Sequence, residues 1–84
     1  MKWHFEIFIR DLTEFTDGLA DALYEAGCDD GTLASCNLSA SITFTRAAPT
    51  LQSAIESAIA NIKSTGLKPG KLVIHDLDHY AEAV

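Results

Sequence analysis

The sequence has few basic residues, and one long stretch has none at all. Its 84 residues include 6 Lys and Arg against 12 Asp and Glu, which gives a formal net charge of −6. Residues 11–30 contain seven acidic residues and no basic one. Because nucleic acids carry a dense row of negative phosphates, a chain with this charge repels them. We therefore expect no direct contact with nucleic acid.

Cysteines and long apolar runs are also scarce. Cys28 and Cys36 are the only cysteines. If Thr32–Cys36 is a strand, they lie on the order of 20 Å apart, beyond the Cα separation of about 7 Å that a disulfide tolerates. Two reduced thiols fit a reducing compartment. Charged residues interrupt every apolar stretch before the roughly 20 residues of a membrane span, and the N-terminus lacks a signal-peptide layout. We expect a cytoplasmic protein without membrane contact.

Motifs of catalysis and cofactor binding are absent as well. The chain has no P-loop, no GxGxxG and no Cys-x-x-Cys pair. Cys28 is followed by Asp29 and Asp30, whose negative charges favour the protonated thiol and so weaken it as a nucleophile. We therefore expect no enzymatic activity, no catalytic residue and no cofactor.

The apolar periodicity predicts the order of the structural elements. Alternation with period 2 indicates strands, and apolar stripes at helical spacing indicate helices. The predicted strands are Lys2–Arg10, Thr32–Cys36, Ser41–Arg46 and Lys71–His75. One predicted helix begins near Glu14, with Asp11 as its N-cap, and ends before Gly27. The other is opened by Pro49 and Thr50 and closed by Gly66, with turns at 37–39 and 68–70.

This order, β-α-β-β-α-β, predicts an α+β domain of the ferredoxin-like class. Two interleaved βαβ units give a four-stranded antiparallel sheet with both helices on one face. Residues 1–76 form the predicted domain, and residues 77–84 form a short C-terminal tail. The other face of the sheet is left open.

In the alternative interpretation, the open face of this fold binds a small ligand or a second copy of the chain. His4, Glu6 and His75 are residue types that hold a divalent metal, but we interpret them as ordinary surface residues and expect no metal site. A dimerisation or small-ligand-sensing module would use the residues that line this face: His4, Phe8, Arg10, Thr43, Thr45 and His75.

Acidic residues are the most distinctive feature of the chain. Glu14, Asp17, Asp21 and Glu25 recur at helical spacing, so we expect them to form one stripe opposite the apolar face of the first helix. Steps of three and four residues rise about 4.5–6 Å along a helix, which is of the order of the separation between backbone phosphates. Together with Asp29 and Asp30, this stripe is the predicted surface for a basic partner.

Two segments also resemble a known family. Residues 22–32, which contain the run EAGCDD, and residues 44–59, which contain FTRAAPT, resemble the N-terminal βαββαβ domain of small bacterial DNA-binding or antitoxin-like proteins. In that family the corresponding patterns are EAGCDD and FxREAPS. A helix-turn-helix usually follows the domain there and supplies the DNA contacts; it is lacking here, so the resemblance implies no DNA-contacting residue in this chain.

These observations predict a small acidic regulator or inhibitor without catalytic activity. Its expected partner is a protein of the nucleic-acid machinery with a basic surface, bound through the acidic first helix. An antitoxin-like protein and a phage anti-CRISPR protein that mimics DNA are both of this type. The alternative is the dimerisation or ligand-sensing module described above, and a homodimer remains open.

Overall fold

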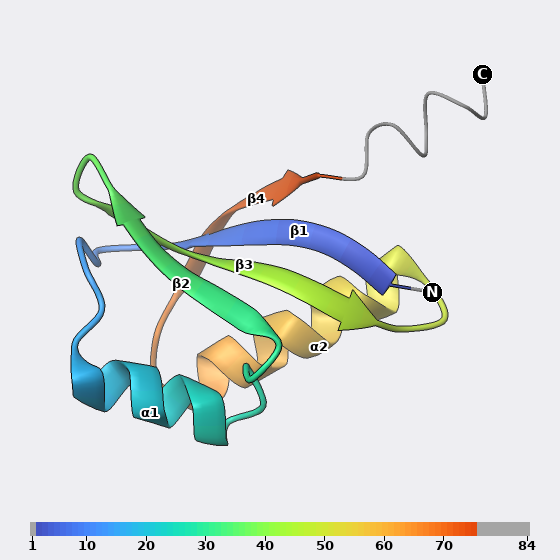
Figure 1. The fold of residues 1–84 in the computed structure, drawn as a ribbon, viewed down its shortest axis with the longest axis horizontal. Coiled ribbons are helices and arrows are strands. Elements are labelled where there is room, and N and C mark those ends of the chain that lie inside the picture. Colours follow the sequence, from blue (N-terminus) through green and yellow to red (C-terminus); the bar gives the residue numbers. More distant parts are fainter. Residues whose placement is uncertain (1, 76–84) are drawn as a thin grey trace.

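The computed structural model describes residues 2–75 (Figure 1). It contains four strands and two helices in the order β-α-β-β-α-β. Their bounds are β1 Lys2–Ile9, α1 Asp17–Glu25, β2 Gly31–Cys36, β3 Ser39–Ala47, α2 Leu51–Ser64 and β4 Pro69–Ile74. The predicted tail, residues 77–84, lies outside the described residues.

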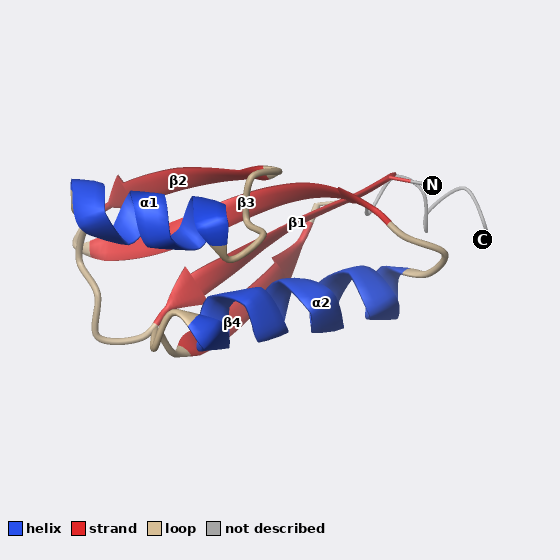
Figure 2. Cartoon of the chain, turned by 90° about the horizontal axis from the view of Figure 1, so that it is seen from below, coloured by secondary structure: helices blue, strands red, loops and turns tan. Residues whose placement is uncertain are grey.

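The strands form one antiparallel sheet in the order β2-β3-β1-β4. β1 and β3 are therefore central, and β2 and β4 are the two edges. Figure 2 shows α1 near β2 and α2 along the part of the sheet that contains β1 and β4. The ferredoxin-like prediction is confirmed by this order and by the antiparallel pairing.

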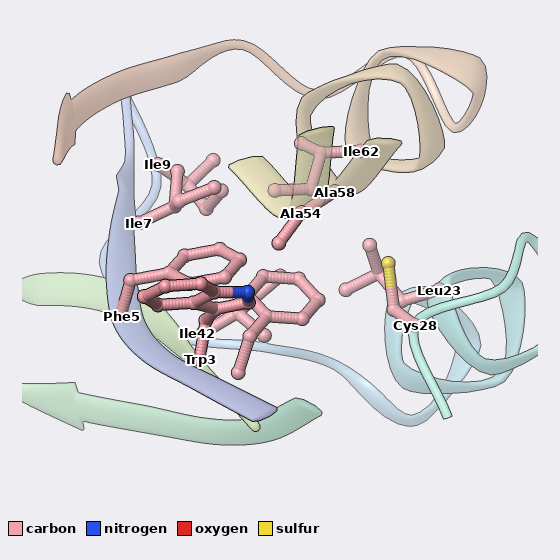
Figure 3. Packing of buried hydrophobic residues seen from close by; sticks show 11 residues of the cluster. Trp3, Phe5, Ile7, Ile9, Leu23, Cys28, Ile42, Ala54, Ala58 and Ile62 are labelled. Atoms are coloured by element: carbon pink, nitrogen blue, oxygen red, sulfur yellow. The ribbon is translucent and has the colours of Figure 1, made fainter. Parts of the chain in front are cut away.

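The core lies between the sheet and the two helices. Alternation along β1 buries Trp3, Phe5, Ile7 and Ile9. The register places Phe5 opposite Phe44, and the centroids of their rings are 5.3 Å apart in a stacked arrangement. The helices complete the core with Leu23 of α1 and Ala54, Ala58 and Ile62 of α2 (Figure 3). Because α1 buries only Leu23, most of its surface faces solvent.

The predicted start of the first helix is wrong. The helix begins at Asp17, and the hydroxyl oxygen of Thr16 caps it by accepting a hydrogen bond from the Leu19 amide. Asp11 has φ 58°, whereas an N-cap needs the extended region. Residue 12 is also tied to the sheet, since its carbonyl accepts the amide of Ala40. The chain before Thr16 is therefore a loop, and Glu14 lies outside the helix.

Smaller corrections apply to the ends of other elements. Pro49 precedes the second helix instead of opening it, because Thr50 is the N-cap and forms a capping box with Ser53. The predicted turn at 68–70 is shorter, because β4 already begins at Pro69. Pro69 is compatible with the first position of an edge strand, where its missing N–H is not required.

The hairpin between β2 and β3 closes as a two-residue turn. Asn37 and Leu38 both have positive φ, 52° and 63°, which is the conformation of a type I′ turn. Cys36 pairs with Ser39 across it. The predicted turn at 37–39 is confirmed, one residue shorter than expected. Its geometry fixes the register of β2 on β3, its neighbour at this edge of the sheet.

Candidate functional site

The structure divides the six predicted binding residues into three groups. Asp17, Asp21 and Glu25 lie on α1, and all three are exposed. Glu14 is exposed in the loop before the helix. Asp29 and Asp30 follow the helix in the loop that leads to β2, where Asp29 is exposed and Asp30 is half-buried. The structure thus keeps one acidic helix but not the continuous stripe that the spacing predicts.

Asp30 differs from the other acidic residues because it is paired internally. Its two carboxylate oxygens accept hydrogen bonds from Nε and Nη2 of Arg46, at 2.7 and 2.8 Å. This bidentate arrangement is the strong form of the Arg–carboxylate pair. It raises the pKa of the Arg46 guanidinium. The negative charge of Asp30 is therefore largely neutralised by Arg46 within the fold.

Arg46 also joins three separate segments of the chain. Besides Asp30, it donates to the Gly27 carbonyl at 2.8 Å and to Asn61 and Ser57 of α2, both at 3.0 Å. Every N–H group of its guanidinium therefore has an acceptor. Its carbon Cζ lies 5.0 Å from the centroid of the Phe44 ring. Arg46 connects β3 to α2 and to the loop between α1 and β2.

This network was not predicted from the sequence, although a signal for it exists. Arg46 has the same parity along its strand as Ile42 and Phe44, so alternation places it on the face toward the helices. A basic residue there requires partners. Gly27 and Asp30 belong to one of the two segments that carry the family resemblance, and Arg46 belongs to the other. The network therefore gives a structural role to residues in both segments.

Cys28 is a buried free thiol beside this network. Burial raises its pKa because the thiolate is desolvated. The Arg46 charge opposes this shift, whereas Asp30 and Asp29 add to it. The arrangement favours the protonated thiol, which is the less reactive form. The structure thus places Cys28 in the core as a thiol of low reactivity.

The raised pKa of Cys28 predicts a loss of stability at high pH. The unfolded thiol titrates near pH 8.5, and the folded thiol titrates higher. Its contribution to stability is complete below the unfolded pKa and is lost as the pH rises through the folded pKa. Urea denaturation between pH 7.5 and 10 should show a steeper decline for the wild type than for Cys28→Ala. Parallel declines would contradict the assignment.

Polar groups on the open face of the sheet pair with one another. Glu6 accepts a hydrogen bond from the Ser41 hydroxyl at 2.6 Å, and its second oxygen lies 3.3 Å from Nε2 of His75. Nδ1 of His4 lies 3.1 Å from the Thr45 hydroxyl. Within residues 2–75 no group of three His, Cys, Asp or Glu side chains is placed to hold a metal ion. The use of this face by a ligand or a second copy stays a prediction.

A shallow groove lies between α1 and the edge strand β2. Its volume is about 260 Å³. Phe15, Asp17 and Ala20 line it on the side of the helix, and Leu33 and Ser35 line it on the side of the strand. The groove therefore places one of the exposed acids next to apolar side chains and next to the sheet edge. No prediction from the sequence included it, because it depends on the position of α1 relative to β2.

The described part of the chain contains no helix that is both long and apolar enough to cross a membrane. Comparison with protein-family models, with curated proteins and with solved structures found no match to this chain.

Proposed function

We propose that this chain is a binding domain without catalytic activity and that the exposed carboxylates of α1 bind a basic surface of another protein. The observation that carries the proposal is the absence of counter-charges on this helix. Asp17, Asp21 and Glu25 make no ion pair with another residue in 2–75. Of the six predicted acids, only Asp30 forms an ion pair within the described residues.

These acidic residues lower the stability of α1. Asp21 and Glu25 are one turn apart, and like charges at that spacing destabilise a helix by a few tenths of a kcal/mol. Glu25 is the last residue of α1, where the negative end of the helix dipole disfavours an acid. The last turn contains no basic residue that would relieve it. A basic partner would supply the counter-charge that these carboxylates lack within the described fold.

The partner that fits this surface is a protein whose own ligand is negatively charged. A four-residue step along α1 rises about 6 Å, comparable to the spacing of phosphates along a nucleic-acid strand. An acidic surface of this kind also increases the rate of association with a basic cleft. Regulators of the antitoxin-like type and inhibitors that mimic DNA would both work in this way.

The double variant Asp21→Asn/Glu25→Gln tests the proposal. Titrated with hexalysine at 50 mM salt, it should bind about fivefold more weakly than the wild type, because two exposed charges each contribute a few tenths to about 1 kcal/mol. Raising the salt to 200 mM should reduce the difference. Fluorescence anisotropy of a labelled peptide measures both effects.

The matched control is Asp11→Asn/Glu56→Gln, which neutralises the same number of exposed acids away from α1. Asparagine tolerates the positive φ of residue 11. This control should bind hexalysine nearly as the wild type does. The α1 variant should also be slightly more stable than the wild type to urea, by a few tenths of a kcal/mol. If hexalysine binding is weakened equally in both variants, net charge alone explains the effect, which would contradict a specific role for α1.

A further inference from the structure

β2 is an edge strand whose outer backbone groups face away from the sheet. The amide of Thr45 donates to the carbonyl of Asp30, so these two residues form a hydrogen-bonded pair. Hydrogen-bonded pairs alternate along an antiparallel ladder, so residues 32, 34 and 36 direct their backbone groups toward β3 in the same way. The intervening residues, Leu33 and Ser35, therefore direct their N–H and C=O groups to the open edge. Their side chains point to the helix face, since Leu33 lies opposite the buried Ile42.

The two edges of the sheet are protected to different degrees. Proteins commonly shield an exposed edge with proline, charged side chains or a bulge. β4 has all of these, with Pro69, Lys71 and a register shift next to Ile9. β2 reads Gly-Thr-Leu-Ala-Ser-Cys and contains none of them. The β2 edge is thus open to pairing with another strand.

Acidic side chains lie beside this open edge. Asp17 lines the groove between α1 and β2 together with Leu33. Asp21 and Tyr24 follow Asp17 at i+4 and i+7, so they continue the same side of the helix, and Tyr24 is 68% exposed. A strand added at β2 would therefore place every second side chain beside acidic and aromatic groups.

We propose that the β2 edge binds an extended segment of the partner protein in which basic and apolar residues alternate. The segment adds antiparallel to β2 as a fifth strand, with its basic side chains beside α1 and its apolar side chains on the open face. Main-chain hydrogen bonds to Leu33 and Ser35 give the register, as in other cases of strand addition. This inference rests on the proposed function, because the same acids supply the charge complementarity.

Charge also argues against a second copy of this chain as the occupant. Antiparallel pairing of β2 with its own copy would bring the two α1 helices together on one face of the joined sheet. Each helix carries Asp17, Asp21 and Glu25 without a basic residue. Facing rows of like charge oppose that arrangement. A basic segment turns the same contact into an attraction.

The test uses the peptide acetyl-Lys-Val-Lys-Val-Lys-Val-Lys-amide with the 84-residue chain. In nuclear magnetic resonance spectra, its binding should slow hydrogen exchange at the amides of Leu33 and Ser35 by at least tenfold. The register is tested with two modified peptides. In the proposed pairing the lysine amides face β2 and the valine amides face solvent, so N-methylation of the internal lysines should abolish binding, whereas N-methylation of the valines should leave it within twofold.

A pair of substitutions tests the same contact from the side of the protein. Ser35→Pro removes an outward N–H without removing a bond to β3 and should weaken peptide binding at least tenfold. Ser35→Val keeps the N–H and should preserve binding. Peptide binding that leaves the Leu33 and Ser35 amides unprotected, or that tolerates N-methyl-lysine, would overturn strand addition while leaving the acidic surface of α1 in place. Protection that appears without peptide and rises with protein concentration would identify a second copy as the occupant and would also overturn it.

Discussion

Replacing Arg46 with methionine should lower the free energy of unfolding by about 3 kcal/mol. The change leaves Asp30 as a half-buried carboxylate without its cation, and breaking a buried pair from one side typically costs about 3–5 kcal/mol. The lower end applies because the Asp30 side chain keeps 30% of its surface exposed. Folded domains of this length are stable by roughly 4–13 kcal/mol, so the loss is a large fraction of the total. Urea denaturation followed by circular dichroism measures it.

Arg46→Lys and Asp30→Asn are the informative comparisons. Lysine retains the charge but cannot reach several acceptors in a fixed planar arrangement, so it should recover part of the loss. Asp30→Asn keeps an acceptor oxygen and removes the charge. If the bidentate contact carries the effect, the double variant Arg46→Met/Asp30→Asn should be more stable than the sum of the two single losses predicts. Strict additivity would show that Arg46 acts through its other contacts.

The apolar pattern carries enough information for the fold. Along β1, strict alternation separates Trp3, Phe5, Ile7 and Ile9 from the outward side chains, and all four are buried. A slip by one residue would turn this whole set toward solvent. The period-2 and helical segments therefore predict both the order of the elements and the face that each one buries.

The ends of elements were predicted less well, because they depend on tertiary contacts. Asp11 and Glu14 have the residue types and the spacing of a helix start. The backbone there is instead fixed by two tertiary hydrogen bonds: the Arg10 amide donates to the Lys68 carbonyl just before β4, and the Leu12 carbonyl accepts the Ala40 amide of β3. The local preference for a helix is weak compared with these contacts, and the helix begins only at the next capping residue, Thr16.

The candidate site was predicted in part for the same reason. Composition alone identifies the acids of α1, since they need only be exposed. It does not show that Asp30 is paired with Arg46 or that α1 lies beside an open edge. Both depend on the distance between segments that are far apart in the sequence. The pairing removes one charge from the predicted surface, and the position of α1 adds a strand edge to it.

Two glycines beside this surface should respond in opposite directions to the same substitution. A Cβ atom at Gly31 would lie 2.6 Å from Cγ2 of the buried Ile42 and 3.2 Å from the Cys28 carbonyl oxygen. Overpacking of this kind typically costs about 1–3 kcal/mol. We therefore expect Gly31→Ala to lower the free energy of unfolding by about 2 kcal/mol, measured by urea denaturation.

Gly18→Ala is the matched substitution. Gly18 is exposed in the first turn of α1, and a Cβ atom there meets nothing within 4 Å. Alanine in a helix is more favourable than glycine by about 0.5–1 kcal/mol, so Gly18→Ala should stabilise the chain by up to that amount. Because the substitution changes no charge on α1, this variant should also bind hexalysine as the wild type does. If both substitutions destabilise the chain, the first turn of α1 packs more closely than its exposure indicates. If alanine is tolerated at residue 31, β2 can move away from Ile42 at little cost in free energy.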